Sequence, residues 1–179
     1  NYDQALADLQ HAIDLRPGEI GLYFSRGVTY FLSQQFDNAV KDFDKYIRKE
    51  PKDPSAYLNR GASYLFLGDT LKAVSDYNKA IRLDRFDPEG YVRRGRVYAS
   101  QSKYDLAIDD MNKAIELDTT NTFAYFNRAL MFYEQERYNE AMDDLNRVLR
   151  DEPGNALTLY NRGLINAQLG SFEAALDDM

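Results

Sequence analysis

The sequence contains no cysteine among its 179 residues and only one histidine, His11. Without cysteine, disulfide bonds and thiolate metal sites are excluded, while cytoplasmic and periplasmic locations both stay compatible. A single imidazole without a neighbouring serine, cysteine or second histidine assembles no catalytic unit. We therefore expect His11 to lie on the surface and the chain not to be an enzyme.

Long apolar runs and basic clusters are also missing. No stretch reaches the roughly 18 consecutive apolar residues of a membrane span, and residues 1–4 lack the order of a secretory signal. The formal net charge of −7 argues against a nucleic-acid backbone as the main partner. The sequence thus predicts a soluble chain with no membrane span and no nucleic-acid ligand.

No motif for a metal or cofactor stands out. No phosphate-cradling glycine motif is present, and residues 118–121 lack the glycine and distal glutamate of a calcium loop. Adjacent acids such as Asp109 and Asp110, or Asp143 and Asp144, point about 100° apart on a helix, so they do not converge on one atom. We expect neither cofactor nor metal.

A small residue instead recurs every 34 residues, at Gly27, Gly61, Gly95, Ala129 and Gly163. Large side chains flank it, and an invariant alanine follows at 39, 73, 107, 141 and 175, with a large residue four positions later, the last being Met179. This register divides the chain into 1–19 (the second helix of a truncated repeat), 20–53, 54–87, 88–121, 122–155 and a truncated 156–179.

Each block reads as two helices, because apolar residues recur at three- and four-residue steps on both sides of a break near its fifteenth residue. The break is Gly68 or Gly170 in two blocks, and all five prolines lie between blocks. Because a lone helical hairpin leaves one face apolar, successive hairpins must stack. The predicted fold is an all-α superhelix, one solenoid domain of antiparallel helix pairs.

The spacing resembles the tetratricopeptide repeat (TPR) over all 179 residues. Residues 57–64, Tyr-Leu-Asn-Arg-Gly-Ala-Ser-Tyr, carry the first half of the family pattern, and residues 39–43, Ala-Val-Lys-Asp-Phe, carry the second. Arginine replaces the usual leucine before the small residue. Since the register starts and stops inside repeats, we expect an excerpt of a longer array whose cut ends could associate end to end.

Each of these arginines has a matching aspartate at the twenty-third position of its block. The arginines are Arg26, Arg60, Arg94, Arg128 and Arg162, and the aspartates are Asp8, Asp42, Asp76, Asp110, Asp144 and Asp178. We predict a ladder of Arg–Asp pairs between packed helices, because a planar guanidinium suits a bidentate carboxylate at a partly buried site. Pairing across the repeat boundary, as in Asp8 with Arg26, is slightly favoured over pairing within a repeat.

The resemblance implies that the first helices line a concave groove. The groove residues that it implies are Phe24, Leu58, Asn59, Arg93, Arg96, Phe126, Asn127, Tyr160 and Asn161. The apolar stripe consists of the fifth residues of the blocks, Phe24, Leu58, Val92, Phe126 and Tyr160, and Arg93 and Arg96 form a basic patch near its centre. The stripe marks a partner site if it is exposed, although neighbouring first helices could cover much of it.

Two recognition modes known in the family can be compared with these positions. The carboxylate clamp of co-chaperones finds only Asn59 and Arg93 in place, and Glu89 would repel a carboxylate. The asparagine ladder of peptide-glycosylating members is matched by Asn59, Asn127 and Asn161, three of five positions.

The predicted function is a scaffold or adaptor segment that binds a peptide or partner protein in the groove. The alternative is a substrate-recruiting arm of a larger enzyme or of a secretion or assembly machine. A third class, helical-repeat RNA binding, is disfavoured by the fixed 34-residue period and the acidic ends of the chain.

Overall fold

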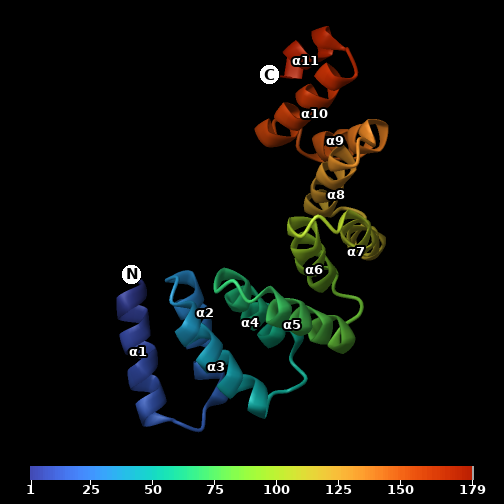
Figure 1. Cartoon of the computed structure of the whole chain (residues 1–179). Coiled ribbons are helices and arrows are strands. Elements are labelled where there is room, and N and C mark those ends of the chain that lie inside the picture. The colour runs from blue at the N-terminus through green and yellow to red at the C-terminus, as the bar shows by residue number, and fades with distance from the viewer. Residues whose placement is uncertain (179) are drawn as a thin grey trace. The chain divides into compact units, whose positions relative to one another are not determined.

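The computed structural model describes residues 1–178, which form eleven α-helices joined by short loops (Figure 1). The helices are α1 (Tyr2–Leu15), α2 (Ile20–Leu32), α3 (Phe36–Lys49), α4 (Pro54–Phe66), α5 (Thr70–Leu83), α6 (Pro88–Ser100), α7 (Tyr104–Leu117), α8 (Thr122–Glu134), α9 (Tyr138–Asp151), α10 (Ala156–Gln168) and α11 (Phe172–Asp178). None of these helices within residues 1–178 is both long and apolar enough to cross a bilayer.

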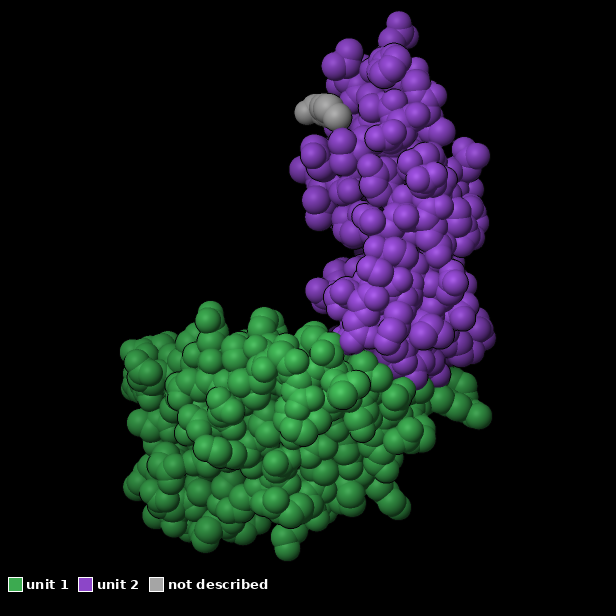
Figure 2. All heavy atoms as spheres, viewed as in Figure 1, with its two compact units in different colours: residues 1–86 green, residues 87–179 purple. Residues whose placement is uncertain are grey.

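The helices fall into two compact units, residues 1–86 with α1 to α5 and residues 87–179 with α6 to α11 (Figure 2). In unit 1, α2 packs on α3 and α4 on α5, and in unit 2, α6 packs on α7, α8 on α9 and α10 on α11. These pairs coincide with the 34-residue blocks, which confirms the all-α fold of stacked antiparallel helix pairs. The joining of all blocks into one solenoid domain stays a prediction.

The loops before α4, α6, α8 and α10 carry the capping residues that start these first helices. The carboxylate of Asp53 accepts a hydrogen bond from the Ser55 amide at 2.9 Å, and Pro54 occupies the first turn of α4, where a missing N–H costs nothing. Asn121 and Asn155 cap α8 and α10 in the same way, each through its side-chain oxygen. Pro54 and Pro88 therefore begin α4 and α6, and Pro17, Pro51 and Pro153 lie in the loops between blocks.

The loops inside the blocks share a left-handed residue at the fifteenth position. Its φ is +81° at Gly68 and +77° at Gly170, and it is also positive at Gln34, Ser102 and Glu136. A left-handed residue just past a helix C-terminus lets the next amides bond back to the orphan carbonyls. The sequence located this break from two glycines, and the same turn forms in the other three blocks without them.

The small residue at the eighth position permits close contact within each helix pair. A Cβ added to Gly61 would lie 2.8 Å from Cε1 of Tyr77 and 3.2 Å from the carbonyl oxygen of Ala73, closer than packing allows. Ala73 itself is fully buried, as are its counterparts Ala39, Ala107 and Ala141. The pattern of large, small and large side chains thus determines how closely the two helices of a block pack. Met179, the last large residue of the pattern, lies outside the described residues.

The Arg–Asp ladder forms, but with a different pairing from the favoured one. Arg26 pairs with Asp42 and not with Asp8, because the two helices of a block bring residues 16 apart into contact. Arg60 with Asp76 and Arg128 with Asp144 show the same bidentate geometry, with N···O distances between 2.6 and 2.8 Å. Arg94 with Asp110 and Arg162 with Asp178 complete the series.

The boundary between blocks is bridged by the remaining guanidinium nitrogen. Nη1 of Arg60 donates to Asp44 at 2.6 Å, and Nη1 of Arg128 donates to Asn112 at 2.6 Å. The same nitrogen of Arg26 reaches Gln10, and that of Arg162 reaches Asn146. Each of these arginines therefore holds three helices together, through an acceptor at the twenty-fifth position of the preceding block that the sequence pattern did not indicate.

Candidate functional site

Three asparagine side chains on first helices are held in one orientation. The amide Nδ2 donates to the backbone carbonyl four residues earlier: from Asn59 to Ser55 at 2.8 Å in unit 1, and from Asn127 and Asn161 at 2.7 Å each in unit 2. A primary amide has two N–H groups and a carbonyl oxygen. One N–H orients the side chain, so the second N–H and the oxygen remain to pair with a ligand.

The apolar stripe is only partly exposed. Leu58 and Val92 are buried, with 7% and 3% of their surface exposed, and Phe24 packs edge-on against Phe43 with ring centroids 5.7 Å apart. Neighbouring helices therefore do cover part of the stripe. Phe126 is half-buried against the core, whereas Tyr160 is 53% exposed.

The first helices α8 and α10 of unit 2 expose apolar side chains beside their asparagines. Phe123 and Leu157 are 49% and 59% exposed, and both lie four residues before a ladder asparagine, Asn127 or Asn161. Because residues four apart lie on the same side of a helix, each apolar side chain neighbours an amide. The exposed apolar surface and the oriented amides therefore occupy the same face of α8 and α10.

The two central arginines make local contacts. Nε of Arg93 donates to Oε1 of Glu89 at 2.6 Å, one turn earlier on α6. The guanidinium of Arg96 lies 5.4 Å from the ring centroid of Phe123, a cation–π contact that links α6 with α8. Glu89 thus neutralises part of the basic patch that the sequence predicted, whereas Arg96 stays exposed beside an aromatic ring.

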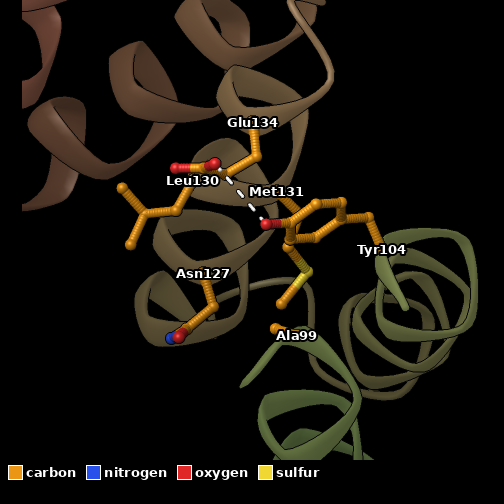
Figure 3. Close-up of a pocket in the computed structure, with 6 residues that line it drawn as sticks. All are labelled: Ala99, Tyr104, Asn127, Leu130, Met131 and Glu134. Carbon is orange, nitrogen blue, oxygen red and sulfur yellow. Dashed lines mark hydrogen bonds between the residues drawn. The ribbon is translucent and has the colours of Figure 1, made fainter. Parts of the chain in front are cut away.

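A cavity of about 270 Å³ opens between α6, α7 and α8 in unit 2 (Figure 3). We call it the Ala99 cavity, and its lining residues are Ala99, Tyr104, Asn127, Leu130, Met131 and Glu134. Tyr104 reaches in from the start of α7 and donates through its hydroxyl to Oε2 of Glu134 at 3.5 Å. The cavity therefore combines apolar walls with the amide of Asn127 and the carboxylate of Glu134.

A second cavity of about 220 Å³ lies on the other side of α8. We call it the Phe126 cavity, and it is lined by Thr122, Phe123, Phe126, Val148, Glu152, Asn155 and Leu157. Both oxygens of Glu152 are occupied, by the Thr122 hydroxyl and the Asn155 amide at 2.8 Å each. These two hydrogen bonds, that from Asn155 first, lower the pKa of Glu152. The remaining surface suits an apolar side chain.

A basic cavity of about 760 Å³ occurs in unit 1, beside the loop that joins α1 and α2. Its cations are Lys45, Arg48 and Lys49, and the ammonium of Lys45 lies 3.8 Å from the ring centroid of Tyr23. Arg48 and Lys49 occupy the last turn of α3, where positive charge complements the helix dipole. None of the predicted groove residues lines this cavity.

The histidine and the adjacent aspartate pairs do not form a catalytic or metal-binding cluster within residues 1–178. His11 is exposed on α1, and Asp109 and Asp143 point into solvent while Asp110 and Asp144 are buried in the ladder. Within residues 1–178, no group of three or more potential metal ligands comes together.

The predicted groove residues include neither Tyr104 nor Glu134. A signal was nevertheless present in the register. The twelfth residue of a block is large in three blocks, as Phe31, Leu65 and Tyr133, but is alanine at Ala99 and Ala167, and a small residue at this position indicates a place where side-chain volume is missing.

Models of one repeat family match most of the chain. Models described as TPR repeat match residues 95–135 and 129–170, and models described as tetratricopeptide repeat match residues 54–87 and 1–54. No curated protein shows a significant match to the chain.

Many solved structures share the fold. The C-terminal part of a TPR repeat-containing protein from Cytophaga hutchinsonii aligns with a TM-score of 0.85 at 21% identity, over 99% of this chain and 74% of that one. MamA from Desulfovibrio magneticus RS-1 aligns with a TM-score of 0.81 at 18% identity, over 90% and 91%. YrrB, described as a TPR protein with an unusual peptide-binding site, aligns at 0.74 and 22% identity, over 95% and 88%.

Proposed function

Since the chain belongs to the tetratricopeptide repeat family, whose members generally act as protein–protein interaction modules and are typically non-catalytic, we propose that its first helices bind an extended peptide segment of a partner protein. The proposed contact residues are Phe24 and Asn59 in unit 1, and Arg93, Arg96, Phe126, Asn127, Tyr160 and Asn161 in unit 2. Leu58, which is buried, supports this surface from within.

The observation that carries this proposal is the common orientation of the asparagine amides. Asn127 and Asn161 lie 34 residues apart and make the same bond to the carbonyl four residues earlier, at 2.7 Å in both. Each amide can therefore give one hydrogen bond to a peptide carbonyl and accept one from a peptide N–H, whatever the peptide's sequence. Backbone pairing of this kind favours an extended ligand.

Selection among peptides would come from the apolar surface beside the amides. Phe123, Leu157 and Tyr160 offer exposed apolar area, and the Phe126 cavity offers a recess for one side chain. Burial of such area favours binding, and buried aromatic residues are frequent hot spots. Arg96 adds a preference for a ligand carboxylate, although its contribution falls as salt screens it.

The test uses random peptides displayed on phage, panned against the full chain, followed by calorimetric titration with an enriched peptide. Asn127→Ala and Phe126→Ala should each weaken binding by about 1–2 kcal/mol, or about 5- to 30-fold. Arg93→Ala should cost a similar amount at low salt and less at high salt.

Two substitutions on second helices serve as controls. Asn139→Ala removes the same amide as Asn127→Ala from an exposed position on α9, and Lys113→Ala removes a surface charge from α7. Both should leave affinity unchanged. If Lys113→Ala weakens the peptide while Asn127→Ala and Phe126→Ala do not, the second helices carry the binding surface and the proposal is wrong.

A further inference from the structure

The Ala99 cavity differs from the corresponding place in unit 1 at three residue positions. At the corresponding place in unit 1, Phe31 fills the space, and Phe66 stacks on Phe36 with ring centroids 4.7 Å apart and planes 6° apart. Phe31 also contacts both rings edge-on, at 5.6 Å each. Two repeats later the same positions hold Ala99, Tyr104 and Glu134. The place is therefore a solid aromatic cluster in unit 1 and a cavity in unit 2.

The carboxylate at this cavity keeps unused acceptor capacity. Oε2 of Glu134 receives only the long bond of 3.5 Å from the Tyr104 hydroxyl. Within residues 1–178, Oε1 of Glu134 has no hydrogen bond and neither oxygen has an ion-pair partner. The nearby Arg137 bonds to Glu140 instead. This contrasts with Glu152 in the Phe126 cavity, both of whose oxygens are occupied.

We propose that the Ala99 cavity receives a lysine or arginine side chain of the bound peptide, with its methylene stem against Leu130 and Met131 and its cationic head on Glu134. Long cationic side chains place an apolar stem on apolar surface and keep the charge at the rim, and the composition of this cavity matches that division. The inference rests on the proposed peptide binding, whose ligand class it narrows.

The position of Asn127 connects this cavity with the peptide backbone. Asn127 lines the cavity (Figure 3). Its amide is oriented by the bond to the Phe123 carbonyl at 2.7 Å. A peptide residue whose backbone pairs with this amide is therefore placed to direct its side chain toward Glu134. The asparagine amides would fix the register of the peptide, and the cavity would bind one of its side chains.

The experiment titrates the full chain, labelled with ¹³C at the methionine methyl groups, with N-acetyl-lysinamide and with N-acetyl-norleucinamide. The chain has four methionines, so the methyl spectrum is simple, and Met131 lines the cavity. The lysine compound should shift the Met131 methyl resonance with an affinity about three- to fivefold higher than the norleucine compound, the size of an exposed ion pair. Equal affinities, or no shift of Met131 with the lysine compound, would overturn the proposal.

Two variants test the charge of Glu134 and the volume of the Ala99 cavity separately. Glu134→Gln should remove the preference for lysine over norleucine and leave the weak binding of both. Ala99→Phe should abolish the Met131 shift, and it should fold, because a phenylalanine already occupies this position in the block 20–53. Glu136→Gln removes the same charge two residues away, outside the cavity, and should change nothing. A loss of preference in Glu136→Gln equal to that in Glu134→Gln would overturn the proposal.

Failure of the cavity proposal is distinguishable from failure of the proposed peptide binding. Peptides that lose affinity on Asn127→Ala and Phe126→Ala, but carry no enriched lysine or arginine and ignore Ala99→Phe, would uphold groove binding and refute the cavity's role. Failure of the display experiment, together with a lysine-selective Met131 shift, would instead refute the extended-peptide mode and leave a cation-binding cavity.

Discussion

Removing one partner of a ladder pair should destabilise the fold far more than removing a surface ion pair. In the pair Arg128–Asp144, the N···O distances are 2.7 and 2.6 Å, and Asp144 is only 4% exposed. Arg128→Ala leaves this carboxylate buried without its two donors, and it also removes the bond to Asn112. We expect a loss of about 3 kcal/mol in the free energy of unfolding, at the lower end of the range for breaking buried pairs because the arginine is 19% exposed.

Replacing both partners should cost much less. Burial raises the pKa of Asp144 because desolvation outweighs the stabilisation that Arg128 gives to the charged form. Desolvation of the Asp144 carboxylate therefore has a free-energy cost that Arg128 offsets only in part. An apolar pair of similar volume avoids this cost. We expect the double variant Arg128→Met with Asp144→Leu to lie within about 1 kcal/mol of the parent.

The assay is urea unfolding followed by circular dichroism and by tyrosine fluorescence, since coincident curves show that each variant unfolds in one step. Equal slopes then allow the midpoints to be compared as free energies. Lys113→Ala, which breaks the exposed pair with Glu116, is the control and should cost less than about 1 kcal/mol. If Arg128→Ala costs no more than this control, the ladder is an ordinary surface network and the reasoning is refuted.

Two further predictions concern unit 1. Gly27→Ala would place a Cβ 2.9 Å from the ring of the buried Phe43 and should destabilise the fold by about 1–3 kcal/mol. Gly21→Ala, whose added Cβ has no atom within 4 Å, should stabilise it by about 0.5–1 kcal/mol. Thermal unfolding midpoints that shift in the same direction for both variants would contradict this prediction. Burial, with the hydrogen bond that Tyr46 donates to Asp53, raises the pKa of Tyr46 from 10.0 to about 12. The stability that this shift provides is complete below pH 10 and is lost as pH rises through 12, so the parent should lose stability relative to Tyr46→Phe over that interval, and parallel urea midpoints would exclude the effect.

Much of the fold follows from local sequence alone. A fixed 34-residue period, apolar residues at helical spacing and prolines between blocks determine the helix pairs, because these signals act within a few residues along the chain. Small residues such as Gly61 and Ala73 also reveal which faces meet, since only they permit the observed approach. The ladder residues could be found in the same way, because polar residues at core-facing positions must be paired.

Other features depend on how helices pack, which spacing does not encode. The sequence slightly favours Asp8 over Asp42 as the partner of Arg26, whereas the packing within the helix pair selects Asp42. Likewise, five residues share the fifth position of their blocks, yet Leu58 is 7% exposed and Tyr160 is 53% exposed, because the neighbours that cover them differ. The Ala99 cavity is of the same kind, since it is the volume left where three helices meet and a large side chain is missing. Composition and periodicity determine which faces are apolar, and only the tertiary structure decides which apolar and charged groups remain free to meet a ligand.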